Sequence, residues 1–87
     1  MARIQDIQAL EHRIYDAVEE YISNPSGYNS ARIHIWCDDE MNYQAECVDE
    51  CEVNEDNGIY DITDFIDNGD IDYDRVDEVA NEWIFIE

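Results

Sequence analysis

The sequence contains no lysine and only four arginines, whereas aspartate and glutamate together number 24. One proline and three glycines leave few positions that break a helix or require a turn. No stretch approaches the roughly 18 consecutive apolar residues of a transmembrane helix, so none is expected to span a membrane. The shortage of basic residues also argues against a cationic surface.

The formal net charge is −20 in 87 residues. The usual magnitude for a small domain is about 2–8. Charges of one sign at this density repel one another and destabilise the compact state. Direct binding to nucleic acid needs a cationic surface, and an anionic membrane also attracts cations, so neither ligand is expected. The charge instead predicts a basic protein as the partner.

A single domain over residues 1–87 is expected, because domains seldom divide below about 100 residues. Apolar residues make up 45% of the chain, which is enough for a modest core and excludes a wholly disordered acidic tail. The cysteines are odd in number, and Asp6 stands where a secretory signal would be apolar. Reduced thiols and a location in the cytoplasm are therefore expected. The oligomeric state stays open.

Apolar residues recur at steps of three and four over residues 4–22, the period of an amphipathic helix. Pro25 and Gly27 follow and predict its end. A second helix is predicted over residues 73–83, with Asp72 as its N-cap and Asp74 in its first turn. Its apolar stripe consists of Tyr73, Val76, Val79, Ala80 and Trp83.

Alternating apolar and polar residues predict the two strands of a hairpin, over residues 31–37 and 41–48. Ile33, Ile35 and Cys37 are expected to point into the core from the first strand, and Tyr43 and Cys47 from the second. His34 and Trp36 are expected on the outward face. The alternation breaks at residues 48–50, which predicts a bulge or a strand end there.

A third strand is predicted over residues 59–62, after a turn at 54–58. Ile62, Phe65 and Ile66 have helical spacing, which favours a single helical turn ended by Asn68 and Gly69. Alternatively, Asn68-Gly69 forms the turn of a hairpin between two strands. Residues 84–86 are expected to form a short edge strand. The predicted fold class is α+β, in the order α-β-β-β-α, with a three-stranded antiparallel sheet covered by helices on one face.

The sequence favours neither a zinc site nor a calcium site. Zinc sites usually combine two pairs of closely spaced ligands, and the chain has one such pair, Cys47 and Cys51. Cys37 and Cys47 fall on the inward faces, so buried structural cysteines are the better interpretation. Residues 58–64 resemble the second half of a calcium loop, but the first ligand position is Val53, which cannot coordinate. No metal and no cofactor are expected.

Catalysis is not expected either. His12 and His34 belong to no recognisable triad, and the sequence has neither a phosphate-binding glycine loop nor a hydrolase motif. Pairs of carboxylates are uninformative, because 24 acids generate them by chance. The sequence therefore predicts a binding protein rather than an enzyme.

Residues 38–74 contain fifteen acids and no basic residue. A charged run is usually a solvated surface, but ordinary surfaces mix both signs. Within residues 61–78, eight acids are opposed only by Arg75. Carboxylates there are expected to accept hydrogen bonds from arginine and lysine, as DNA phosphates do. The predicted partner-binding residues are Asp61, Asp64, Asp67, Asp70, Asp72, Asp74, Asp77 and Glu78.

In size, charge and order of elements, the chain resembles the small acidic DNA-mimic inhibitors of phages and mobile elements, including some anti-CRISPR proteins. The segment from Phe65 to Gly69, followed by an acidic helix start that bears Tyr73, is similar to the layout of one family of CRISPR nuclease inhibitors. The resemblance implies that the protein occupies the DNA-binding groove of a bacterial nuclease or regulator. It assigns no individual residue.

The sequence thus predicts a non-enzymatic DNA mimic that occupies the basic nucleic-acid-binding surface of a bacterial defence or regulatory protein. The alternative is a small acidic adaptor, or an antitoxin-like neutraliser of a basic protein, without DNA-like geometry. Apolar exposure separates the two. A mimic needs a face of carboxylates, whereas an adaptor binds through an apolar patch with a charged rim.

Overall fold

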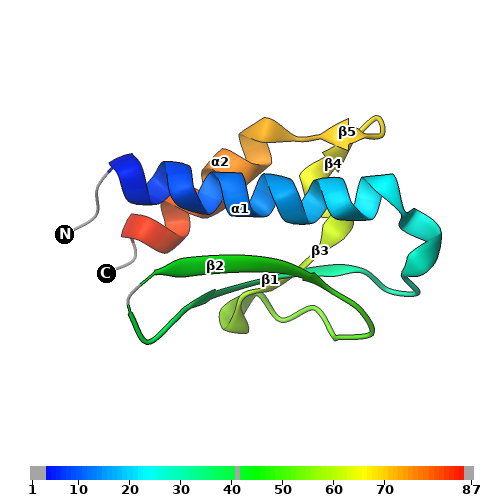
Figure 1. The fold of residues 1–87 in the computed structure, drawn as a ribbon, viewed down its shortest axis with the longest axis horizontal. Coiled ribbons are helices and arrows are strands. Elements are labelled where there is room, and N and C mark those ends of the chain that lie inside the picture. The colour runs from blue at the N-terminus through cyan, green and yellow to red at the C-terminus, as the bar shows by residue number, and fades with distance from the viewer. Residues whose placement is uncertain (1–3, 41, 86–87) are drawn as a thin grey trace.

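The computed structural model describes residues 4–40 and 42–85. Two long helices pack over one face of a three-stranded sheet, and a small hairpin precedes the second helix (Figure 1). The helices are α1 (Ile4–Ser23) and α2 (Tyr73–Phe85), with short 3-10 helices η1 (Pro25–Gly27), η2 (Glu55–Asn57) and η3 (Ile62–Phe65). The strands are β1 (Arg32–Cys37), β2 (Tyr43–Val48), β3 (Ile59–Asp61), β4 (Ile66–Asp67) and β5 (Asp70–Ile71).

The first helix forms where the apolar period predicts it. Leu10, Ile14 and Val18 are fully buried beneath α1, since residues three and four apart share one face of a helix. The helix ends at Ser23, and Pro25 begins the short helix η1. Proline fits there because its fixed φ and missing N–H suit the first helical position.

The sheet has the order β2-β1-β3, and both pairings are antiparallel. Ile33 lies opposite Cys47 on one side and Tyr60 on the other. Ile33 and Ile35 are fully buried, so the inner face of the sheet is the one that the helices cover. The predicted α+β class, with a three-stranded antiparallel sheet covered on one face, is confirmed. The predicted strand end near residues 48–50 is also found, because β2 stops at Val48.

The expectation that Cys37 is buried is wrong. Cys37 is the last residue of β1, lies opposite Tyr43 and is exposed, whereas Cys47 is partly buried against the core. Alternation of side chains along a strand sets the direction in which each one points. It does not set how completely each position is covered, and Cys37 at the end of β1 stays exposed.

Residues 59–71 combine both of the predicted alternatives. A single helical turn, η3, buries Ile62 and Phe65 and ends at Phe65. Asn68 and Gly69, with φ of 53° and 82°, then form the turn between β4 and β5. The interpretation of these two residues as the end of the helical turn is therefore wrong. Asn-Gly prefers the left-handed conformations that a two-residue hairpin turn requires.

The second helix starts at its predicted cap. The Asp72 carboxylate accepts a hydrogen bond from the backbone N–H of Arg75 at 3.2 Å. The helix continues to Phe85, so the strand predicted over residues 84–86 is wrong at positions 84 and 85, while Ile86 lies outside the described residues. In the last turn of a helix, each backbone N–H bonds to the carbonyl four residues earlier, so α2 can continue through residues 84 and 85 without any other partner. A strand over the same residues would need a neighbouring strand to bond.

Candidate functional site

The tip of the β4–β5 hairpin carries two of the predicted acids. Asp67 and Asp70 lie opposite each other across the Asn68-Gly69 turn, and both are exposed. The Asp70 carboxylate accepts a hydrogen bond from the backbone N–H of Ile71 at 2.9 Å. The tight turn therefore projects two carboxylates side by side, next to the start of α2.

The start of α2 extends this acidic surface. Asp72 is partly buried as the N-cap, and Asp74 and Asp77 are exposed on the helix. Asp77 is braced by Asn81, whose amide donates to the Asp77 backbone carbonyl at 2.7 Å and to its carboxylate at 3.2 Å. Five of the eight predicted residues thus follow one continuous segment from the hairpin into α2.

The other three predicted residues lie beside arginines. Asp61 Oδ1 lies 4.0 Å from Arg32 Nη1. A hydrogen bond from the backbone N–H of Thr63 lowers the pKa of the Asp61 carboxyl group. Glu78 bonds Arg75 one turn away on α2. Burial lowers the pKa of Arg75, but the bond to Glu78 and the charge of Asp64 help to raise it overall. Asp61, Asp64 and Glu78 are therefore partly neutralised within the protein.

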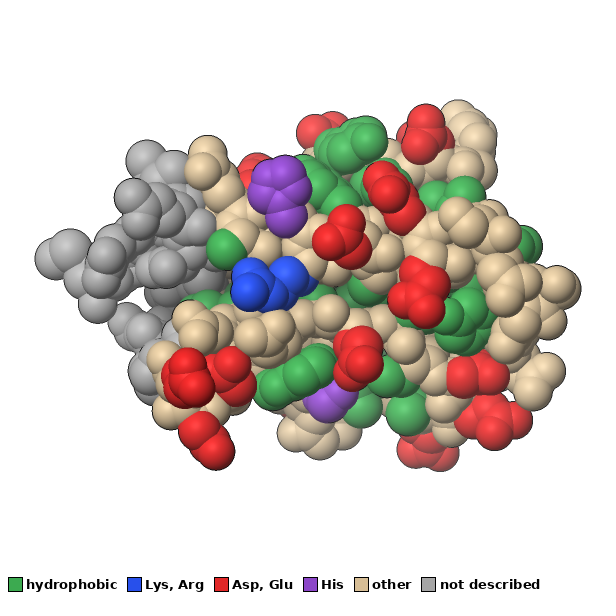
Figure 2. Space-filling view, viewed as in Figure 1, with side chains coloured by type: hydrophobic (Ala, Val, Ile, Leu, Met, Phe, Trp, Pro, Cys, Tyr) green, Lys and Arg blue, Asp and Glu red, His purple; other side chains and the backbone are tan. Residues whose placement is uncertain are grey.

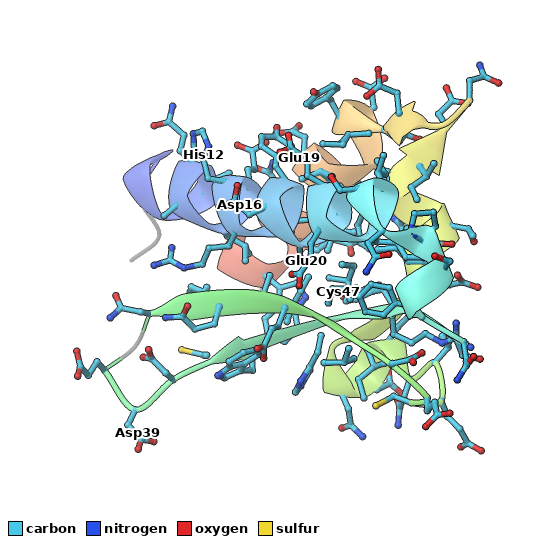
Figure 3. The ribbon with its side chains drawn as sticks, turned by 45° about the vertical axis from the view of Figure 1, so that its right-hand side comes forward. His12, Asp16, Glu19, Glu20, Asp39 and Cys47 are labelled. Atoms are coloured by element: carbon cyan, nitrogen blue, oxygen red, sulfur yellow. The ribbon has the colours of Figure 1, made fainter. Side chains whose placement is uncertain are left out.

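Helix α1 brings further acids to the same region, which the sequence prediction did not include. Asp16 and Glu19 are exposed on α1, and Figure 3 shows both with His12 along the helix. Glu20 points instead toward Cys47 of β2 (Figure 3). Their position off the apolar stripe of α1 could have indicated an outward face. Nothing local to the sequence indicates that this face adjoins α2.

Two contacts join α1 to α2 across this surface. The first is between the Tyr15 and Tyr73 rings, which meet edge to face with their centroids 5.2 Å apart. Within α1, the Tyr15 ring centroid also lies 5.8 Å from that of His12. The second is between Glu11 of α1 and Asp77 of α2. The pKa of the Glu11 carboxyl group is raised, first by burial and then by a hydrogen bond to Asp77 and by the negative charge of Asp77. The two helices thus form one acidic surface. We call it the helical face and define it as Glu11, Asp16, Glu19, Asp67, Asp70, Asp74 and Asp77.

The described arginines are engaged elsewhere. Arg13 donates to the Gln44 side chain at 3.0 Å, beside the edge strand β2, and to the Ala9 carbonyl at 3.3 Å. Arg32 approaches Asp61, and Arg75 bonds Glu78. Figure 2 shows red carboxylates spread widely over one side of the molecule and blue atoms confined to one small patch. The helical face consequently keeps most of its charge unbalanced.

Apolar exposure is small in the part of the chain that the structure describes. Among the large hydrophobic side chains there, Val53 at 44% and Tyr73 at 55% are the exposed ones. His34 and Trp36 contact each other on the outward face of β1, with ring centroids 5.0 Å apart, but both are partly covered. Val53 and Tyr73 lie on separate parts of the chain, in the loop after β2 and at the start of α2.

Other chemistries find little support in the described residues. They contain no group of three His, Cys, Asp or Glu side chains arranged to hold a metal ion. The pKa of Cys47 is raised by burial, which disfavours the reactive thiolate. Neither of the described helices has the length and apolar character needed to cross a bilayer.

Comparison with known proteins gives no relative. No family model matches the chain, and neither a curated protein nor a solved structure matches it. The geometry and charge of the molecule are therefore the guides to its function.

Proposed function

We propose that the protein is a non-enzymatic DNA mimic whose helical face occupies the basic nucleic-acid-binding surface of a bacterial defence or regulatory protein. The observation that supports this most directly is the unbalanced charge of that face. Its carboxylates come from α1, the β4–β5 hairpin and α2, and the described arginines bond other groups. Carboxylates accept charge-assisted hydrogen bonds from arginine and lysine, as phosphates do.

The dimensions of the molecule are consistent with the proposal. The principal extents are 39 × 23 × 18 Å. Duplex DNA carries one charge per about 1.7 Å of axis, so a duplex as long as the molecule carries about 23 charges. The formal net charge of the protein is −20. The protein therefore offers a basic groove a charge density close to that of the nucleic acid it would replace.

The small apolar exposure favours a mimic over an acidic adaptor. An adaptor of the alternative kind needs an apolar patch of a few hundred Å² inside its charged rim. The exposed hydrophobics of the described residues are instead scattered, with Val53 in a loop and Tyr73 on α2. The adaptor function remains as the other outcome of the test below.

The test is competition with duplex DNA for a partner captured from a bacterial lysate. A variant that neutralises the hairpin and α2 (Asp67→Asn, Asp70→Asn, Asp74→Asn and Asp77→Asn) should weaken binding at least tenfold. A matched control (Asp39→Asn, Glu40→Gln, Glu46→Gln and Glu52→Gln) removes four exposed charges elsewhere and should weaken it much less. Binding should also weaken steeply with salt, because released counterions contribute to association with basic grooves.

Two results would contradict the proposal. If the partner binds this protein and duplex DNA together, without mutual loss of affinity, the protein is an adaptor and not a mimic. If the two quadruple variants lose affinity equally, net charge alone controls binding and the helical face has no special role.

A further inference from the structure

A second candidate site lies away from the helical face, between η2, β3 and the C-terminal part of α2. An open pocket of about 310 Å³ is lined there by Glu55, Asp56, Tyr60, Glu82 and Trp83. Pockets for small molecules usually measure about 300–1,000 Å³, so this one is at the lower limit. Its size suits a single side chain or a small cation better than a cofactor.

The aromatic wall of the pocket is held in place. The Trp83 indole N–H donates to the Tyr60 hydroxyl at 2.9 Å, and the Tyr43 ring meets Trp83 edge to face at 6.2 Å. Gly58 lies directly behind the indole, because a Cβ there would be 2.9 Å from Trp83 Cζ2. The indole is therefore fixed before any ligand arrives, which reduces the entropy lost on binding.

The rim of the pocket is negative. Glu55, Asp56 and Glu82 are exposed carboxylates from two elements, η2 and α2. The negative charge of these residues acts on Tyr60 in the pocket wall. Burial raises the pKa of the Tyr60 hydroxyl, and the charges of Glu82 and Glu55 raise it further. The hydrogen bond from Trp83 and the charge of Arg75 lower it in part. Arg75 is not part of the lining, and it bonds Glu78. The lining thus combines aromatic rings with three carboxylates.

We propose that this pocket binds the guanidinium group of an arginine side chain presented by the basic partner. A guanidinium is planar and weakly hydrated, so it can stack on an indole while its N–H groups bond carboxylates in pairs. A lysine ammonium is a strongly hydrated point charge and gains less from an aromatic wall. The inference depends on the proposed function in one respect, namely that the partner is a basic protein.

The experiment titrates N-acetyl-arginine amide into ¹⁵N-labelled protein at 150 mM NaCl and follows the two tryptophan indole N–H signals. The signal of Trp83 should shift and saturate, while that of Trp36, which does not line the pocket, should stay in place. N-acetyl-lysine amide should bind at least about fivefold more weakly. The variant Glu55→Gln with Glu82→Gln should weaken the arginine probe about tenfold or more.

The matched control removes two charges outside both the pocket and the helical face, by Asp39→Asn with Glu46→Gln, and should leave the response of Trp83 unchanged. Equal effects of the arginine and lysine probes, or a shift of both indoles without saturation, would overturn the inference in favour of diffuse counterion binding. Because the probe is a free amino-acid derivative, this result does not depend on the partner. The proposed function fails separately, through the DNA competition described above.

Discussion

Asp49 connects two loops that are far apart in the sequence. Its carboxylate accepts hydrogen bonds from the backbone N–H groups of Ser30 at 2.7 Å, Glu50 at 3.0 Å and Asn29 at 3.1 Å. These bonds, with that of Ser30 first, lower the pKa of Asp49. The side chain therefore holds the entry to β1 against the end of β2.

Replacing this residue should destabilise the protein in a pH-dependent manner. We expect Asp49→Ala to lower Tm at pH 7, and Asp49→Asn, which keeps an acceptor oxygen, to lower it less. A lowered folded-state pKa means that the stabilisation is fully present above the ordinary value of 3.8 and is lost as pH falls through the folded value. Denaturant unfolding at pH 7 and near pH 2 provides the measurement. A gap between wild type and Asp49→Asn that persists in acid would contradict this explanation.

Glu11 and Asp77 are an unfavourable pair between α1 and α2. The pKa of Glu11 is raised above its ordinary value of 4.5, first by burial and then by Asp77. We expect Asp77→Asn to stabilise the fold at pH 7 by about 0.2–1 kcal/mol, the usual size of an exposed charge interaction. The Asn side chain still has an oxygen that can accept the bond from Asn81.

The pH dependence of this gain has the opposite sign to that of Asp49. A raised folded-state pKa stabilises the protein below the unfolded value, and the effect is lost as pH rises through the folded value. The advantage of Asp77→Asn should therefore be greatest at neutral pH and shrink as Glu11 takes up its proton. Thermal unfolding of dilute protein from pH 7 to pH 5, above the isoelectric point near 4.1, measures it. An advantage that grows in acid would show that the two carboxylates do not interact.

At the scale of elements, two glycines with nearly equal φ have different roles. Gly58 (φ 81°) follows η2, and a Cβ there would lie 2.2 Å from the Ile35 carbonyl oxygen. Gly69 (φ 82°) lies in the β4–β5 turn, and a Cβ there would meet nothing within 4 Å. Only the first position combines backbone strain with a collision.

We predict that Gly69→Ala lowers the free energy of unfolding by about 1–2 kcal/mol, the cost of a left-handed conformation. Gly58→Ala should cost roughly 3 kcal/mol or more, because overpacking adds to the same strain. It should also move the indole of Trp83, whose signal reports on the pocket. Urea unfolding of both variants decides the matter, and equal losses would mean that the sheet near Ile35 relaxes easily.

The elements differ in how far the sequence could predict them. The helical period of α1 and the alternation of β1 are local patterns, so both elements and the face that they bury follow from the sequence. At Asn68-Gly69 two local rules competed, since the pair suits both a helix end and a hairpin turn. The exposed end of β1 and the joining of α1 to α2 depend on packing between distant segments. The pocket depends on such packing too, because its lining combines Glu55 of η2 with Glu82 of α2.

At the scale of the whole molecule, the unbalanced charge should oppose folding. The radius of gyration is 12.4 Å. The Debye length falls from about 30 Å at 0.01 M salt to about 3 Å at 1 M, so low salt leaves most of the repulsion within the molecule unscreened. We expect a higher Tm in 0.5 M NaCl than in 10 mM buffer.

The control for this measurement is the variant with neutralised Asp67, Asp70, Asp74 and Asp77. Salt also strengthens apolar burial, but that effect is common to both proteins, so the variant should gain less in Tm than the wild type. Equal gains, or no gain in the wild type, would mean that the carboxylates are compensated locally.

The position of β2 at the edge of the sheet has a consequence for the protein in bulk solution. An edge strand offers unpaired backbone groups on which a strand of another copy can align. At neutral pH the net charge of −20 keeps copies apart. The protection fades as the solution approaches the isoelectric point near 4.1. The carboxylates proposed to attract a basic partner are thus also a colloidal barrier, and mild acidification should turn a clear solution into one that forms β-rich aggregates.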